Sequence, residues 1–231
     1  MALECTHIRF ALALKDRFKA KDMKKYISGT VYPDSRYITK IARNLTHNKE
    51  FADKKFYNND NFKKGWAVHL ICDEILPIVR QKSFPDLLGK NKGEIHQGNE
   101  LWIIVTALKI ILDIKDFEKF DLQKYIDFLK YVETPNGEDI VKMKEFNQIF
   151  IDMYKGKDKI FIDDAIQMWL KLGINKELAT KIKNKTEELI KDENIVKRIE
   201  TIYDKMIEYY EHLSILSNGS TKNEEKILKT F

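Results

Sequence analysis

Histidine and acidic residues lie at helical spacing in an apolar segment of this sequence, residues 65–74. His69 and Asp73 are four residues apart, so on a helix both side chains leave the same face one turn apart and can hold one ion. His96 and Glu100 repeat that spacing at the start of a second apolar segment. Neutral imidazole and carboxylate are the usual non-thiolate ligands of zinc and similar ions. The two pairs therefore predict a metal site.

Further candidate ligands lie in the same part of the chain. His7, Asp34 and His47 precede the first pair, and His212 is the only histidine outside the first hundred residues. A single pair at this spacing is more often a surface pair or a core histidine than a metal site. Several such residues gathered in one part of the chain favour the metal site.

Helices are expected to position these side chains. Thr6 is a plausible N-cap for a helix that carries His7 in its first turn. Pro33 disfavours helical geometry at the residue before it, so Asp34 is expected either in a turn that aims its carboxylate inward or as an N-cap. The apolar periodicity predicts helices over residues 6–18, 22–27, 38–45, 62–79, 96–112, 117–132, 139–154, 160–172, 176–191 and 195–216.

The composition favours an all-α fold. The chain has 231 residues but only nine glycines and four prolines, while lysine, glutamate, isoleucine and leucine are abundant. We expect a multi-helix bundle with the metal site between helices of its N-terminal half. Residues 1–134 would form this metal-binding helical core. Residues 135–231 would form a helical C-terminal region, either packed into the same domain or as a separate lobe.

Charge and hydropathy indicate little about partners. The formal charge of +5 comes from lysines dispersed among acids, without a basic run typical of a nucleic-acid arm. No apolar run is long enough to cross a bilayer, and the N-terminus does not resemble a secretory signal. Cys5 and Cys72 form no CxxC pair and are expected to be reduced thiols. A cytoplasmic location follows as the expectation.

The order of these residues resembles a known family. The shared pattern comprises Thr6-His7, Gly29-Thr-Val-Tyr-Pro33-Asp34, Thr46-His47, His69-x-x-x-Asp73 and His96-x-x-x-Glu100. It resembles the zinc-dependent phospholipase C family and its relatives among the single-strand nucleases, over roughly the first 110 residues. The resemblance implies that His47, His69 and Asp73 bind one zinc. It also implies that Asp73 bridges to a second ion held in part by His7.

The resemblance extends to residues around these ligands. It implies that His96 and Glu100 belong to a third ligand set, and that Asp34 orients or deprotonates the attacking water. In that arrangement Arg36 and Arg43 would clamp phosphate oxygens, because guanidinium matches them bidentately. A solvated helix face is the alternative for both arginines.

Two features of the family pattern are missing, which favours one or two ions over three. The family uses an N-terminal tryptophan and a further histidine, but this chain starts Met-Ala-Leu-Glu-Cys and has no histidine between Glu74 and Ile95. Zinc is the expected metal, with manganese and iron as alternatives. The expected function is hydrolysis of phosphoric esters by a metal-activated water. The expected partner is a phosphate-containing small molecule or lipid, with nucleic acid as another candidate. The alternative is a non-catalytic binding or scaffolding protein with a structural or vestigial metal site.

Overall fold

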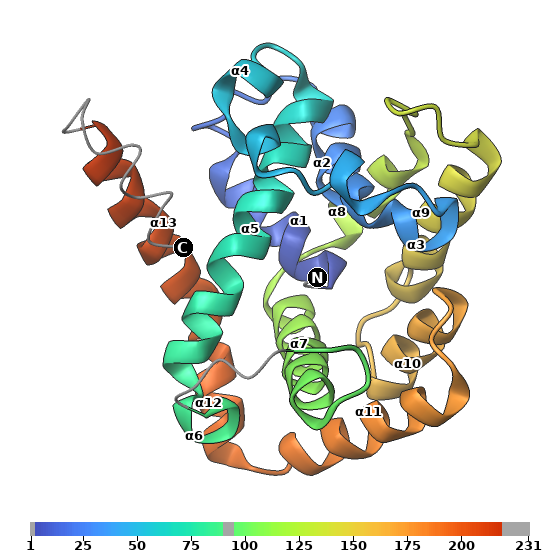
Figure 1. The fold of residues 1–231 in the computed structure, drawn as a ribbon, viewed down its shortest axis with the longest axis vertical. Coiled ribbons are helices and arrows are strands. Elements are labelled where there is room, and N and C mark those ends of the chain that lie inside the picture. The colour runs from blue at the N-terminus through green and yellow to red at the C-terminus, as the bar shows by residue number, and fades with distance from the viewer. Residues whose placement is uncertain (1–2, 90–94, 219–231) are drawn as a thin grey trace.

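The computed structural model describes residues 3–89 and 95–218, and these residues form an all-α bundle (Figure 1). Residues 219–231 of the expected C-terminal region lie outside the described residues. The N-terminal half contains α1 (Glu4–Leu14), α2 (Met23–Val31), η1 (Tyr32–Ser35), α3 (Arg36–Thr39), η2 (Arg43–Leu45), η3 (Lys49–Ala52), α4 (Lys54–Tyr57), α5 (Asn61–Ser83), α6 (Pro85–Leu88) and α7 (Glu100–Lys119). The rest contains α8 (Gln123–Ile126), η4 (Asp127–Lys130), α9 (Ile140–Tyr154), α10 (Ile162–Lys171), α11 (Lys176–Leu189), α12 (Glu193–Glu200) and α13 (Ile202–Asn218).

Most of the buried apolar side chains form one large cluster that includes residues from both halves of the chain, and a smaller cluster contains Trp66. The members of the large cluster run from Leu3 in the sequence to Met206. Helix α7 lies near the centre of the bundle and contacts α1 as well as α11 and α12 (Figure 1). Its apolar sequence is buried around much of its circumference, as expected for a helix with neighbours on several sides.

Helices α2 and α5 cross at unusually short range because each has a glycine at the crossing. A Cβ atom on Gly29 would lie 2.0 Å from the Phe62 carbonyl oxygen of α5, and a Cβ atom on Gly65 would lie 1.9 Å from the Tyr26 carbonyl oxygen of α2. The helix expected over residues 22–27 was predicted to end too early, since α2 continues through Gly29 to Val31. Gly29 serves close helix packing there and does not act as a helix stop.

Helix α1 is attached to α7 through Thr6. The Thr6 amide donates to Asp113 Oδ1 at 3.2 Å, and its hydroxyl donates to Asp116 Oδ2 at 2.7 Å. Arg9 adds an ion pair with Asp116. Thr6 is therefore not the N-cap that the sequence suggested. Helix α1 begins two residues earlier, at Glu4.

Helix boundaries depart from expectation at several points. Helix α5 passes through Pro77 and ends at Ser83, so this proline does not end it. The helix expected over residues 38–45 is divided into α3 and η2, because Lys40 adopts a left-handed conformation with φ 62°. The helix expected over residues 195–216 is divided into α12 and α13. None of the described helices combines the length and apolar character that a bilayer crossing needs.

Candidate metal centre

Five of the predicted site residues meet between α1, η1, α5 and the segment after η2. His7 comes from α1, Asp34 from η1, His47 from the segment after η2, and His69 and Asp73 from α5. Their side chains form two groups that could hold a metal ion, one of His7, Asp34 and His69 and the other of His47, His69 and Asp73. The second group is the set that the resemblance assigned to a single zinc.

The separations within this cluster fit ligands around a common ion. His7 Nε2 lies 3.4 Å from Asp73 Oδ1, and His69 Nε2 lies 3.6 Å from Asp73 Oδ2. His47 Nε2 lies 3.5 Å from Asp34 Oδ1 and 3.8 Å from Asp73 Oδ2. Two ligand atoms bound to a tetrahedral zinc ion at about 2.1 Å lie about 3.4 Å apart. The observed separations are near this value and longer than ordinary hydrogen bonds of about 2.7–3.2 Å.

The backbone of α2 orients His69. Its Nδ1 lies 2.8 Å from the Thr30 carbonyl oxygen. A carbonyl only accepts hydrogen bonds, so Nδ1 carries the proton in the neutral ring and Nε2 keeps a lone pair directed toward the carboxylates. This is the arrangement that metal-binding histidines commonly adopt.

His47 is oriented by the residue before it. Its Nδ1 lies 2.8 Å from Thr46 Oγ1, and the Thr46 hydroxyl donates to the Arg43 carbonyl at 3.3 Å. The single hydroxyl proton is used in that hydrogen bond, so Thr46 Oγ1 accepts a hydrogen bond from the Nδ1–H of His47. The Nε2 lone pair of His47 then faces the carboxylates. Trp66 on α5 holds this segment by donating from Nε1 to the Thr46 carbonyl at 2.7 Å.

His7 is fully buried and stacks on His69, with ring centroids 4.0 Å apart and an interplanar angle of 25°. Its Nδ1 lies 3.4 Å from Oε2 of Glu4, which is one turn earlier on α1. A carboxyl group on the second ring nitrogen of a ligand histidine is a recurring feature of metal sites. Glu4 is thus a candidate to orient His7.

The electrostatics of the cluster favour neutral histidines and ionised aspartates. Burial and the neighbouring His69 lower the pKa of His7 to about 4, and burial lowers the pKa of His47. Burial alone would raise the pKa values of Asp34 and Asp73, but favourable charge interactions and hydrogen bonds, those with the histidines among them, hold both below the usual range. Neutral imidazole and ionised carboxylate are the protonation states that bind metal.

Several polar atoms of the cluster are buried without a hydrogen-bond partner among the described residues. They are both ring nitrogens of His7, both carboxylate oxygens of Asp34, Nε2 of His69 and Oε2 of Glu4. Leaving such atoms unpaired is costly, and clusters of them call for a bound water or ion. The donor types, their separations and their unpaired state all fit a bound divalent cation.

The structure does not bring His96 and Glu100 to this cluster. Both side chains are exposed, and neither belongs to a group that could hold an ion among the residues that the structure describes. Helix α7 begins at Glu100 with Asn99 as its N-cap, so His96 precedes the helix. The prediction that the pair shares one helical face is therefore wrong.

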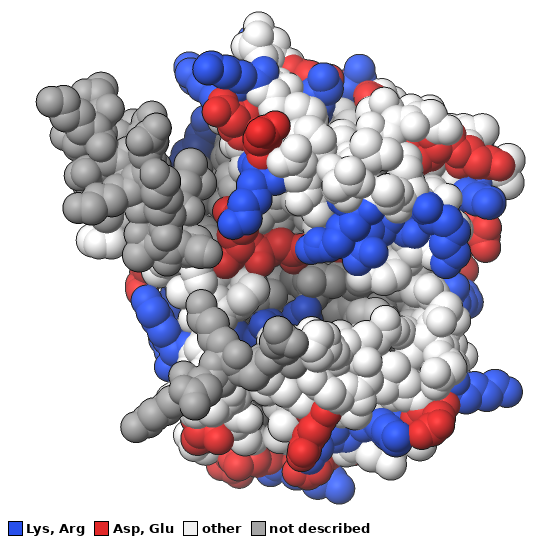
Figure 2. All heavy atoms as spheres, in the orientation of Figure 1, with Lys and Arg blue, Asp and Glu red and all other residues white. Residues whose placement is uncertain are grey.

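The predicted arginines lie near the cluster. Arg36 is half-buried, donates from Nη2 to the Tyr37 hydroxyl at 2.6 Å and has a buried Nε without a partner among the described residues. Arg43 is exposed. Burial and the charge of Asp34 raise the pKa of Tyr37, while Arg36 and Arg43 act in the opposite direction. Figure 2 shows one face of the molecule with a hollow across its middle. Acidic side chains lie at the hollow and basic side chains lie along its edges.

Sequence reasoning missed Glu4, Thr30 and Tyr37. Glu4 lies three residues before His7, so the pattern would have included it if the first helix had been started at residue 4. Tyr37 follows Arg36 directly and could have been considered with it. The carbonyl of Thr30 has no sequence signal, because its role depends on the approach of two helices.

No protein-family model, no curated protein and no solved structure matches this chain.

Proposed function

We propose that this protein is a metal-dependent hydrolase of phosphoric esters. The observation that carries the proposal is the cluster of three histidines and two aspartates, whose facing ligand atoms lie 3.4–3.9 Å apart. The ligand order also resembles that of the zinc-dependent phospholipase C family. Histidine and carboxylate ligands at these separations favour zinc, with manganese or iron as alternatives.

Three residues would hold the first ion. His47, His69 and Asp73 each offer a ligand atom within 4.8 Å of the other two, and the two histidines are held in the required tautomer by their Nδ1 hydrogen bonds. His7 Nε2 faces Oδ1 of Asp73, whereas His47 Nε2 faces Oδ2. Asp73 could therefore contribute one oxygen to each of two ions. When bound, such ions lower the pKa of a coordinated water and polarise a phosphoryl oxygen.

Asp34 would orient the attacking water. Its carboxylate is buried, held in the ionised form and unpaired on both oxygens, so it can accept a hydrogen bond from a water at the cluster. It also belongs to the group with His7 and His69, which makes ion binding its other role. Arg36 and Arg43 would bind phosphate oxygens at the edge of the site, where guanidinium groups match two oxygens at once.

The substrate class proposed here is a phosphate-containing small molecule or lipid in the cytoplasm, with nucleic acid as the other candidate. The structural-metal alternative predicts a closed site, because structural zinc ions use all of their coordination positions for protein ligands. Asp73 is instead 16% exposed at its side chain. That exposure favours an open, catalytic site, which a solvent water can enter.

Metal analysis combined with activity measurements tests the proposal. Protein purified without added metal should contain zinc or bind it stoichiometrically, and should hydrolyse p-nitrophenyl phosphate or bis(p-nitrophenyl) phosphate. His69→Ala and Asp73→Asn should lose metal and activity while remaining folded. Glu74→Gln is the matched control, since this acid follows Asp73 on α5 but belongs to neither ligand group.

The outcomes separate the two functions. A protein that binds no metal, or binds it and stays inactive on both esters with zinc, manganese or iron, would contradict the hydrolase. Loss of folding in His69→Ala, with no activity in the wild-type protein, would favour a structural metal.

A further inference from the structure

A buried arginine lies beyond the cluster on α5. Arg80 is 6% exposed, and its Nε and Nη1 atoms are buried without a hydrogen-bond partner among the described residues. Leaving two guanidinium nitrogens unpaired in the interior is unfavourable, so arginine is rarely buried in this way unless an anion accompanies it. No part of the metal site described above uses this group.

Arg80 is placed toward the cluster by helical geometry. It follows Asp73 by seven residues on α5, which is two turns and nearly the same helix face. Long helical side chains lean toward the N-terminus of their helix, so the guanidinium is carried back toward Asp73. Burial lowers the pKa of Arg80 to about 10, and the charge of Asp73 acts in the opposite direction.

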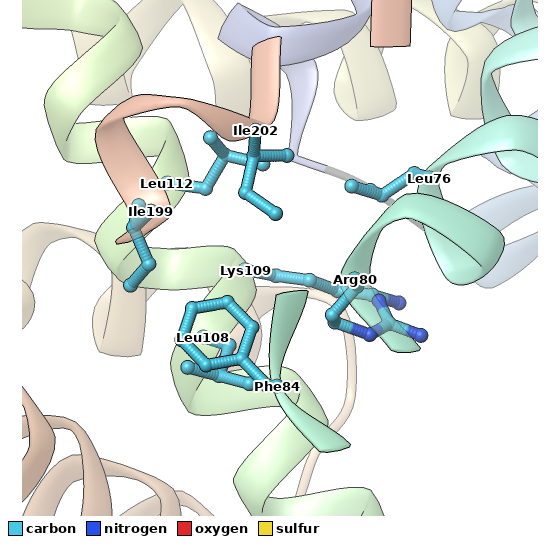
Figure 3. Close-up of a pocket in the computed structure, with 8 residues that line it drawn as sticks. All are labelled: Leu76, Arg80, Phe84, Leu108, Lys109, Leu112, Ile199 and Ile202. Carbon is cyan, nitrogen blue, oxygen red and sulfur yellow. The ribbon is translucent and has the colours of Figure 1, made fainter. Parts of the chain in front are cut away.

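A second cation lies beside Arg80. Lys109 extends from α7 toward Arg80 on α5, and the nitrogen atoms of the two side chains lie away from the apolar residues around their stems (Figure 3). Burial and the neighbouring Arg80 lower the pKa of Lys109 to about 8, whereas Asp73 and Asp34 raise it. Two cations brought together next to the cluster repel each other unless an anion lies between them.

Charge balance indicates which ligand would bind. One divalent ion in the cluster would be balanced by the carboxylates of Asp34 and Asp73, which leaves Arg80 and Lys109 without an equivalent counter-charge among the described residues of the cluster. An anion carrying two negative charges and several acceptor oxygens would satisfy both cations. Phosphate groups meet this requirement, and arginine and lysine are the side chains that most often bind them.

We propose that Arg80 and Lys109 form a phosphate-binding subsite beside the metal cluster, which holds the substrate's phosphoryl oxygens or the phosphate product. This inference rests on the proposed function, because it assigns the subsite to the same reaction. It differs from the predicted role of Arg36 and Arg43, which lie on α3 and η2.

Inorganic phosphate is the probe, with chloride at equal ionic strength as the reference. The wild-type protein, loaded with stoichiometric zinc and freed of excess metal, should bind phosphate in calorimetry and show a higher melting temperature in its presence. Arg80→Met should weaken phosphate binding by about 10- to 100-fold, the usual effect of losing charge-assisted hydrogen bonds. Lys109→Met should weaken it in the same direction.

Two exposed or partly exposed lysines supply matched controls. Lys82→Met removes a cation two residues after Arg80, and Lys115→Met removes one from α7. Both should bind phosphate like the wild-type protein. In phosphate-free buffer Arg80→Met should melt at or above the wild-type temperature, because an unpaired buried charge has been removed. A purely structural arginine would instead give a lower melting temperature and unchanged phosphate affinity.

The results distinguish this inference from the proposed function. Wild-type phosphate affinity in Arg80→Met at full zinc content would overturn the subsite and leave the hydrolase intact. Absence of phosphate binding to both the zinc-loaded and the metal-free wild-type protein would also overturn it. If the protein binds no metal but its phosphate affinity still falls in Arg80→Met, the subsite stands and the proposed function fails.

Discussion

Replacing Gly65 with alanine tests whether the crossing of α2 and α5 sets the geometry of the candidate site. In the native structure the new Cβ atom would lie 1.9 Å from the Tyr26 carbonyl oxygen and 2.8 Å from the Thr30 amide nitrogen. Ordinary contacts of this kind begin near 3.4 Å. Relief therefore requires the two backbones to separate locally by about 1.5 Å.

Two opposing effects determine the sign of the change in stability. Alanine in a helix interior is favoured over glycine by about 1 kcal/mol, so the substitution would stabilise the protein if the site had room. Overpacking of a close backbone contact costs about 1–3 kcal/mol and occasionally more. Because the obstructing atoms belong to backbone and cannot rotate away, we expect Gly65→Ala to lower the free energy of unfolding by about 2 kcal/mol.

The same displacement should reach the metal ligands. The carbonyl of Thr30 holds His69 at 2.8 Å, so separation of α2 from α5 weakens the contact that fixes this ring. Losing an orienting contact of this kind commonly reduces metal affinity by about 10- to 100-fold. Urea unfolding of metal-free protein and zinc calorimetry measure the two effects, with Lys82→Ala as an exposed control on α5. A Gly65→Ala protein more stable than the wild type would refute the close crossing.

Three further outcomes follow from the site geometry. His96→Ala should leave the metal content of purified protein unchanged, because this side chain is exposed and outside both ligand groups. Trp66→Phe should reduce zinc affinity in calorimetry by about 10-fold, because the hydrogen bond to Thr46 that steadies His47 is lost. Acidification from pH 7 to 4.5 should destabilise metal-free wild-type protein more than His7→Gln in urea unfolding. The pKa of His7 is lowered to about 4, so the unfolded chain takes up its proton first and this group's contribution to stability falls with pH.

The sequence pattern identified the five residues of the cluster, but it also included His96 and Glu100, which lie outside it. His69 and Asp73 lie within a long helix, where four-residue spacing places side chains on one face. The same spacing failed for His96 and Glu100, because Asn99 caps the helix between them and the rule holds only inside a helix. An Asn two or three positions into a presumed helix is the signal that would have moved the boundary.

Arg80 illustrates a different limit. The helix expected over residues 62–79 stops one residue short of Arg80, so the sequence did not place this arginine on the same helix face as Asp73. Proline removes the hydrogen bond to the carbonyl of Asp73 but does not prevent the helix from continuing when tertiary packing supports it. Extending the seven-residue spacing from Asp73 through the proline would have reached Arg80. Its lack of a partner, by contrast, is visible only in three dimensions.

The ligands are held by contacts that do not involve an ion. His7 is fixed through the Thr6 bonds to α7, His47 through Trp66, and His69 through the α2 backbone. The contacts that hold His7 and His69 join helices that share the large buried apolar cluster, and Trp66 belongs to a second, smaller cluster. The protein should therefore fold before it binds metal, unlike a zinc finger, in which the metal supplies the folding energy. Packing that forms the site in advance leaves buried polar atoms without hydrogen-bond partners. Binding of a cation and an anion would supply those partners.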